Sequence, residues 1–284
     1  MLHTNYTGLQ AEPSIRLLWT PNTRSTLWAA FTHAVRTPSD AERDFYLSSY
    51  LGNEPNGTEF FARFGANPAF APEQLNGYEI GYRQLIGKNI YLDLAGFFNN
   101  YHDLFNQEIA GPINSESTLP FPINTAAPPT HDLYPARFGN SLYGLTTGGE
   151  IAPEWRPKPY WRLRGSYSYL NMNLSRAQEA PPSLGPASVV GSSPRHEADA
   201  MSSLDLGTKL RLDMIYRYVS ALPAVSAPGY STGDARIAWR LNSHLELSAA
   251  GRNLFQPHHV EYAGDPGLPI GIRRGVYGTL AWTK

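Results

Sequence analysis

Apolar and polar residues alternate along several segments of this chain with a period of two. In residues 161–170, W-R-L-R-G-S-Y-S-Y-L, large apolar side chains at Trp161, Leu163, Tyr167 and Tyr169 are separated by arginines and serines. The same pattern recurs at residues 210–218, 235–240 and 245–252. A period of two predicts strands with one apolar and one polar face. Long strands of about 9–11 residues with this alternation are typical of barrels that span a bilayer.

The pattern predicts eleven strands. They cover residues 13–20, 25–36, 74–83, 90–103, 141–154, 161–172, 197–206, 209–219, 230–240, 245–255 and 272–283, and residues 1–9 are expected to end a further strand. The intervening connections alternate between short and long. The long ones are 37–73, 104–140, 173–196, 221–229 and 256–271. Outer-membrane barrels have short periplasmic turns and long extracellular loops, so we expect the long connections to share one rim.

The six tryptophans give an independent indication of topology. Each lies close to a predicted short connection or to the C-terminus, and none lies in a long connection: Trp19, Trp28, Trp155, Trp161, Trp239 and Trp282. Indole rings prefer the interface between membrane and water, where they form girdles. We therefore expect all six near one rim.

Charged side chains occupy the other strand faces. They are Arg16, Glu79, Arg83, Asp93, Glu150, Arg162, Arg164, Arg211, Asp213, Arg217, Asp234, Arg236, Arg240, Glu246 and Arg252. An arginine facing lipid at mid-bilayer costs about 2–4 kcal/mol, so these residues should face a wet interior or a polar plug. Leu163, Tyr167, Tyr169, Leu212, Tyr216, Ile237 and Leu247 should lie on the opposite face.

Composition narrows the function classes. The chain has 284 residues, a net charge of −1 and no cysteine. The balanced charge does not favour a nucleic-acid partner, and thiol chemistry is excluded. No apolar run is long enough for a transmembrane helix, and the start M-L-H-T-N-Y lacks the features of a signal peptide. Because an outer-membrane protein must be exported, we expect the chain to be the C-terminal piece of something longer.

At this point the chain resembles the C-terminal half of the barrel of TonB-dependent outer-membrane receptors. The matching segments, in order, are P-S-I-R-L-L-W-T-P at 13–21, A-V-R-T-P-S at 34–39, Y-E-I-G-Y-R at 78–83, G-G-E at 148–150, S-P-R-H at 193–196, G-R-N-L-F at 251–255 and the aromatic strand at 276–282. Together they cover essentially the whole chain. Members of that family usually end in Phe, whereas this chain ends W-T-K.

The resemblance implies an all-β fold, a partial antiparallel transmembrane β-barrel with about eleven or twelve of about 22 strands. Residues 1–284 would then be the C-terminal half of the barrel, without the plug domain and the N-terminal strands. It also implies a bacterial outer-membrane location and TonB-energised uptake of a scarce nutrient, in the first place a ferric siderophore. The partners would be membrane lipid, the missing plug and strands, TonB acting through the plug, and a small-molecule chelate.

Two other functions stay open: a passive porin-like or small self-contained barrel, and an outer-membrane hydrolase. The hydrolase needs a Ser–His pair such as His196 with Ser202 or Ser203, and no flanking pattern supports it. His258 and His259 with Glu261, and His131 with Asp132, have no third ligand at a metal-binding spacing. The glycines Gly148 and Gly149 lie within a strand and are expected to permit bending. We therefore predict no enzyme activity, cofactor, catalytic residue or metal site.

Substrate-binding residues cannot be assigned from spacing alone. The best candidates are the aromatic and charged residues of the long connections 37–73 and 104–140. The first of these mixes rings and charges: Asp40, Glu42, Arg43, Asp44, Phe45, Tyr46, Phe60, Phe61 and Arg63. Such mixtures can hold a chelate or a sugar. They are equally typical of a loop that packs on its neighbours, and both interpretations stay open at this stage.

Overall fold

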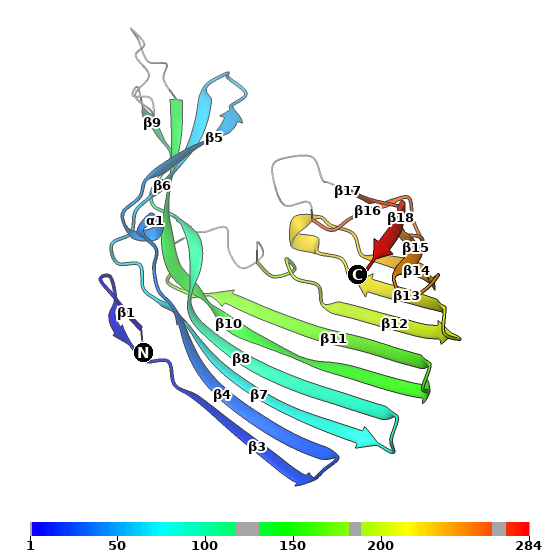
Figure 1. Cartoon of the computed structure of the whole chain (residues 1–284). Coiled ribbons are helices and arrows are strands. Elements are labelled where there is room, and N and C mark those ends of the chain that lie inside the picture. The colour runs from blue at the N-terminus through cyan, green and yellow to red at the C-terminus, as the bar shows by residue number, and fades with distance from the viewer. Residues whose placement is uncertain (1, 117–130, 182–188, 263–270, 284) are drawn as a thin grey trace.

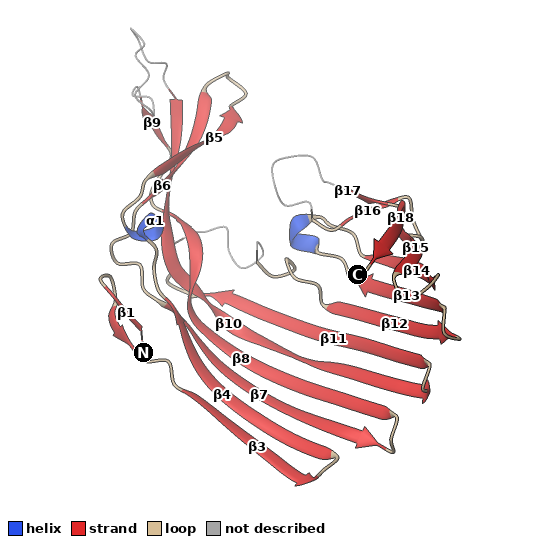
Figure 2. Ribbon diagram, in the orientation of Figure 1, coloured by secondary structure: helices blue, strands red, loops and turns tan. Residues whose placement is uncertain are grey.

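Strands account for nearly all of the regular structure (Figures 1 and 2). The computed structural model describes residues 2–116, 131–181, 189–262 and 271–283. Parts of three long connections and Lys284 lie outside these ranges. Among the described residues, no helix combines the length and the apolar character needed to cross a bilayer.

One continuous path of antiparallel neighbours forms the main sheet. In spatial order it contains β18 (Gly275–Trp282), β15 (Leu245–Arg252), β14 (Tyr230–Arg240), β13 (Leu210–Val219), β12 (His196–Leu206), β11 (Trp161–Arg176), β10 (His131–Lys158), β8 (Ile90–Ile109), β7 (Glu73–Ile86), β4 (Ser25–Arg36) and β3 (Ser14–Asn22). Each predicted strand corresponds to one of these, so the predicted all-β antiparallel fold is confirmed. The predicted segment 272–283 is divided between β18 and a separate hairpin of β16 (His258–Val260) with β17 (Gly271–Arg273).

The sheet is open. Its path of described strands ends at β3 and at β18, which do not pair with each other, and every residue of both strands is exposed. Figure 1 shows the long strands side by side in a curved sheet with separated edges. A closed barrel has no edges, so this sheet is part of a barrel. A separate hairpin of β1 (Leu2–Thr4) with β2 (Gly8–Gln10) precedes β3, in the place where residues 1–9 were expected to end a further strand.

Cross-strand register confirms the two predicted faces. Directly paired residues of antiparallel strands project to the same side. Leu212 pairs with Leu204 on one neighbour and with Ile237 on the other, which forms an apolar row. Asp213, the next residue, pairs with Ser203 and Arg236 on the opposite, charged face. We call these the apolar face and the charged face of the sheet.

All six tryptophans lie at the short-turn rim, as predicted, but they do not form one girdle. Trp19, Trp155, Trp161, Trp239 and Trp282 share the apolar face by register. Trp28 is on the charged face, where it lines a cleft with Glu79 and Arg83. Its ring lies over Gly81, because a Cβ atom on that glycine would be 2.2 Å from the indole.

The first two long connections contain regular structure that the sequence pattern did not reveal. The first holds α1 (Asp40–Arg43), β5 (Leu47–Asn53) and β6 (Glu59–Gly65), and the second holds β9 (Asn114–Glu116). β6 runs parallel to the start of β10, and β9 pairs with the other side of that segment. We call α1, β5, β6, β9 and residues 104–109 and 131–140 the outer extension. A short 3-10 helix at Pro223–Val225 lies in another long connection.

The outer extension carries a buried core of its own. Buried apolar side chains gather in it and next to it, namely Phe61, Ala62, Leu133 and Ala136 in the outer extension and Phe70 and Leu142 in the adjoining chain. Buried apolar area is what stabilises a structure of this kind against the loss of chain entropy. The described parts of the first two long connections are therefore held as an ordered platform above the sheet (Figure 1).

Candidate functional site

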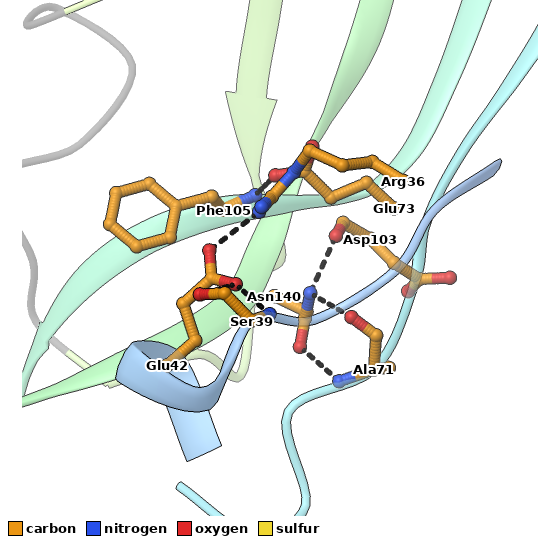
Figure 3. Close-up of polar contacts among 8 residues, drawn as sticks. All are labelled: Arg36, Ser39, Glu42, Ala71, Glu73, Asp103, Phe105 and Asn140. Carbon is orange, nitrogen blue, oxygen red and sulfur yellow. Dashed lines mark hydrogen bonds and ion pairs between the residues drawn. The ribbon is translucent and has the colours of Figure 1, made fainter. Parts of the chain in front are cut away.

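A polar cluster joins the outer extension to the rim of the sheet (Figure 3). Arg36, the last residue of β4, donates from Nε to Oε2 of Glu73 at 2.7 Å and from a terminal nitrogen to Oε1 of Glu42 at 2.8 Å. The other oxygen of Glu73 accepts the backbone N–H of Phe105 at 2.5 Å. One guanidinium therefore ties the ends of β4 and β7 to α1.

Glu42 also fixes the start of α1. Its Oε2 accepts hydrogen bonds from the backbone N of Ser39 at 2.8 Å and from the Ser39 hydroxyl at 2.9 Å. This is the contact of a capping box, in which an acid at the third helical position binds back to the N-cap residue. Burial works against the charged carboxylate, but the hydrogen bonds from Arg36 and Ser39 outweigh burial, so the pKa of Glu42 is lowered. The motif S-x-x-E at 39–42 was the available sequence signal for α1.

Asn140 is the second residue whose side chain joins separate chain segments in this cluster. Its side-chain amide donates to the backbone oxygens of Ala71, at 3.0 Å, and Asp103, at 2.7 Å. Its Oδ1 accepts the N–H of Ala71 at 2.7 Å. Asp103 has a positive φ of 56°, a conformation that occurs at irregular positions of a strand. Asn140 therefore holds three chain segments together at the base of the outer extension, and no spacing in the sequence pointed to it.

The candidate residues of the first long connection, for which ligand binding and packing were both left open, have different roles. The Tyr6 hydroxyl lies 2.6 Å from a carboxylate oxygen of both Asp40 and Asp44, which raises the pKa of that phenol. Arg43 lies over the Tyr6 ring at 4.9 Å and donates to the backbone oxygens of Tyr6 and Pro68. These charges bind the β1–β2 hairpin to α1, so they act as packing contacts within the chain.

The predicted aromatic residues on β6 also pack inward. Phe61 is buried and meets the rings of Tyr50, at 5.4 Å, and His131, at 5.2 Å, both edge to face. Phe60 meets Tyr134 at 6.4 Å. Arg63 lies on β6 opposite Pro135 of β10, and its side chain also interacts with another group of the protein. Phe60 and Phe61 therefore pack on neighbouring residues, which is one of the two interpretations that the sequence left open.

Two predicted residues remain exposed and belong to a larger surface. Phe45 and Tyr46 precede β5, with 53% and 67% of their surface accessible, and Leu47, Tyr50 and Leu51 on β5 are also exposed. We call these five residues the β5 aromatic patch. Among the described strands, β5 pairs on one side with β6 and has no strand paired on its other side. The patch is therefore the apolar surface that the outer extension offers to solvent.

Ion pairs cross the charged face between neighbouring strands. Arg236 lies 3.6 Å from Asp213 and 2.7 Å from Glu246, which links β13, β14 and β15. Similar pairs between strands are Arg83–Asp93, Arg162–Glu154 and Arg217–Asp199, and Arg211–Asp213 is a pair within β13. Near the short-turn rim this face contains a cleft of about 650 Å³, lined by Lys209, Arg211, Arg240 and other charged residues. The charged face is thus suited to water or a polar domain.

The other motifs do not form reactive sites. His196 and Ser202 are six residues apart on β12, which is about 20 Å along a strand. His196 bonds to the Tyr167 hydroxyl, and Ser202 accepts from the indole of Trp161. Gly148 lies in a paired strand, where a Cβ would meet the carbonyl of Tyr169.

The histidine motifs by themselves likewise lack a metal-binding arrangement. His259 is buried, stacks on Tyr230 at 4.1 Å and lies 2.9 Å from Glu261. His131 is fully buried against Phe61, and neither of its ring nitrogens has a hydrogen-bond partner among the described residues. Within the described ranges there is no group of three or more His, Cys, Asp or Glu side chains that could hold a metal ion.

The model of the family "TonB dependent receptor-like, beta-barrel" matches residues 3–254. The chain belongs to this family. Its fold is shared with the siderophore receptor PirA from Acinetobacter baumannii, at 16% identity and a TM-score of 0.71, over 98% of this chain and 41% of that one. The ferric enterobactin receptor PfeA from Pseudomonas aeruginosa, crystallised with enterobactin, gives 17% identity and a TM-score of 0.68 over 99% and 41%.

A third similar structure, entitled "Copper transporter OprC", shows 16% identity and a TM-score of 0.59 over 95% of this chain and 39% of that one. No curated protein shows significant sequence similarity to the chain. This TonB-dependent receptor barrel therefore spans about two fifths of the length of the receptors that it matches. The family and these structures are receptors and transporters, not enzymes, as the sequence predicted.

Proposed function

We propose that residues 1–284 form the C-terminal half of the barrel of a TonB-dependent receptor, which imports a ferric siderophore across the bacterial outer membrane. The observation that carries the proposal is the open antiparallel sheet of a family member, with one apolar and one charged face. The plug domain and the remaining strands would complete it. We call that complete protein the assembled receptor.

The directions of the two edge strands support the proposal that other segments of the receptor complete the barrel. The path from β3 to β18 contains eleven strands and ten antiparallel pairings, so these two edge strands run in the same direction. They cannot pair with each other in an all-antiparallel barrel, which needs an odd number of further strands between them. Bacterial barrels of a single chain have an even strand number. This parity favours the receptor over a small self-contained barrel or porin.

The charged face supports a plugged interior. Its ion pairs and the charged cleft at the short-turn rim offer hydrogen-bonding groups to a polar domain, and they are incompatible with lipid. We propose that the plug contacts this face and that TonB acts on the plug. Transport is then a mechanical opening, and the barrel supplies a rigid wall.

The β5 aromatic patch is the proposed outer contact for the cargo. Its rings are exposed at the rim that carries the long connections, while the charges around it are engaged in the base of the outer extension. Flat rings can stack on the aromatic or planar groups of a chelator. Siderophore receptors among the similar structures favour a ferric chelate as cargo, and the copper transporter is the reason that copper is included in the test.

The assembled receptor in an iron-starved strain provides the test. We expect uptake of radioactive iron from a ferric siderophore that disappears when TonB is deleted. Replacing Tyr46 and Tyr50 with alanine should weaken chelate binding about threefold to tenfold, the value of one or two aromatic contacts. Tyr160→Ala is the matched control, because Tyr160 is similarly exposed at the opposite rim. Uptake that does not require TonB would refute the proposal that the protein is a TonB-dependent receptor. TonB-dependent uptake of copper alone would refute the proposal that a ferric siderophore is the cargo.

A further inference from the structure

A phenol, an imidazole and a carboxylate meet at the long-loop end of the charged face. Nε2 of His259 lies 2.9 Å from Oε1 of Glu261, and the Tyr230 hydroxyl donates to the same oxygen at 3.3 Å. The rings of Tyr230 and His259 stack with their centres 4.1 Å apart. We call these three side chains the Tyr230 cluster. Sequence spacing did not reveal it, because Tyr230 and Glu261 are 31 residues apart in the chain.

The donor atoms of the Tyr230 cluster are spaced like ligands around one metal ion. Bonds of about 2.0–2.2 Å to a transition metal place neighbouring ligand atoms about 2.8–3.4 Å apart. The two contacts at the Glu261 oxygen, 2.9 and 3.3 Å, lie within this range. An ion can therefore enter with little movement of the strands. Three protein ligands leave further positions open to water or to another oxygen donor.

Hydrogen bonds fix the backbone that carries the cluster. His259 is the middle residue of β16 and pairs with Ile272 of β17. Asn253 donates to the carbonyl oxygen of Ile272 at 2.9 Å and accepts from the Thr232 hydroxyl at 2.9 Å. Thr232 lies in β14, the strand that begins at Tyr230. Asn253 thus ties the β16–β17 hairpin to β14, and a site for a metal needs ligands that are held in this way.

The charges around the cluster suit a cation. Glu261 is half-exposed, and among the described residues the only ion-pair partner of its carboxylate is the imidazole of the cluster. Glu197 lies in the same row of the charged face as Tyr230, two strands away. Arg217, on the strand between them, is engaged by Asp199 at 3.1 Å. The position therefore offers carboxylate charge that no arginine or lysine of the described residues neutralises at Glu261.

The state of the imidazole allows its Nε2 to become a ligand. The His259 side chain is 5% exposed, and its Nδ1 makes no hydrogen bond with a described residue. When an ion binds, the phenol proton of Tyr230 is released to solvent, as is usual for metal ligands. The single ring proton of His259 then resides on Nδ1, and the lone pair of Nε2 faces the ion. The charge of the ion thus replaces the two hydrogen bonds at Glu261.

We infer that Tyr230, His259 and Glu261 bind one ferric ion directly at the long-loop end of the charged face. Phenolate and carboxylate are hard, anionic oxygen ligands, which favour an ion of high charge, and imidazole also suits iron. The inference goes beyond the proposed function, because it assigns to the barrel wall a bond to the iron itself, whichever chelate is imported.

Ferric nitrilotriacetate added to the assembled receptor in detergent tests the inference. After gel filtration we expect one ferric ion per receptor and a visible absorption band from charge transfer between phenolate and iron. Tyr230→Phe keeps the ring but removes the donor oxygen, so it should abolish the band. It should also weaken iron binding at least about tenfold, since even the loss of a residue that only orients a ligand costs about 10–100-fold. Tyr218→Phe, on the neighbouring strand and the apolar face, is the matched control.

The other two ligands are tested by their own variants. His259→Gln should weaken iron binding as strongly as Tyr230→Phe, whereas His258→Gln, at the exposed neighbouring position of β16, should not. Glu261→Gln changes an exposed side chain with little risk to folding and should also weaken binding. Iron bound without the visible band, or bound equally by Tyr230→Phe and Glu261→Gln, would overturn the inference.

Two further measurements identify the ion and the level of failure. Cupric nitrilotriacetate is compared under the same conditions, and tighter binding of copper than of iron would overturn the assignment of the ion. TonB-dependent uptake of a ferric siderophore is measured on the same variants. A receptor that imports the siderophore but takes up no iron from nitrilotriacetate would refute this site and leave the proposed function intact.

Discussion

Arg36 and Glu73 face each other across β4 and β7, and Nε of the arginine lies 2.7 Å from Oε2 of the glutamate. The pair sits where the regular sheet gives way to the outer extension. Glu73 is mostly buried, and its second oxygen holds the backbone of Phe105. The platform that carries the β5 aromatic patch is therefore anchored through one arginine.

Replacing this arginine should loosen the outer extension. Arg36→Gln leaves the carboxylates of Glu42 and Glu73 without their cation, at a cost of about 1–3 kcal/mol. Hydrogen exchange of the backbone amides of Glu42 and Asp44 measures the effect, because both amides are bonded within α1 and its cap. Arg156→Gln is the control, since the exposed Arg156–Glu154 pair should contribute under about 1 kcal/mol. Equal exchange in both variants would contradict the anchoring role.

Acid should weaken the contacts of Glu42 that hold α1 in place, over a defined pH range. The folded pKa of Glu42 is lowered from the ordinary value of 4.5, so its stabilisation is complete above 4.5 and is lost as the pH falls through the folded pKa. Limited proteolysis of residues 37–46 between about pH 6 and pH 3 should show increasing cleavage. In Glu42→Gln the same segment should be cleaved more readily at pH 6 and should respond less to acid. A parallel response of both proteins would exclude Glu42 as the titrating group.

Gly81 should not tolerate a side chain. Gly81→Ala places a Cβ atom against the Trp28 ring at 2.2 Å, and relieving this overlap should cost about 1–3 kcal/mol. The midpoint of urea unfolding, followed by tryptophan fluorescence, measures the cost. Gly96→Ala on the neighbouring strand is the control, because its Cβ would meet only ordinary contacts from 3.8 Å outward. A midpoint unchanged in Gly81→Ala would show that Trp28 is free to leave this position.

The 284-residue chain by itself should not form a sealed pore. β3 and β18 expose unpaired backbone groups that cost several kcal/mol each in lipid. A second copy does not solve the problem, because joining β3 of one copy to β18 of another would pair strands that run in the same direction. We expect neither heat-modifiable migration nor steady single-channel conductance from the chain or its tandem duplicate. A stable conductance from the chain alone would favour the small-barrel alternative.

Sequence reasoning succeeded for the main sheet because membrane-type strands repeat one simple rule. The alternation at Trp161–Arg176 and Leu210–Val219 is strict, and a shift by one residue would place Arg164 or Arg211 on the lipid side. Local pattern and long-range pairing thus require the same register. The alternation does not continue through residues 37–73 and 104–140. The sequence pattern therefore did not predict the strands of these segments, β5, β6 and β9. They are short. β6 and β9 are ordered by pairing with distant residues of β10, and β5 is ordered by pairing with β6.

The sequence by itself determined the positions of the strands, the two faces, the rim of the tryptophans and the family resemblance, because period-two patterning and turn length act locally. Only the tertiary structure decided that Asp40, Glu42, Arg43 and Phe61 serve packing while Tyr46 stays exposed, and that Trp28 turns to the charged face over Gly81. Such contacts join residues far apart in the chain, and their geometry depends on how whole strands are paired.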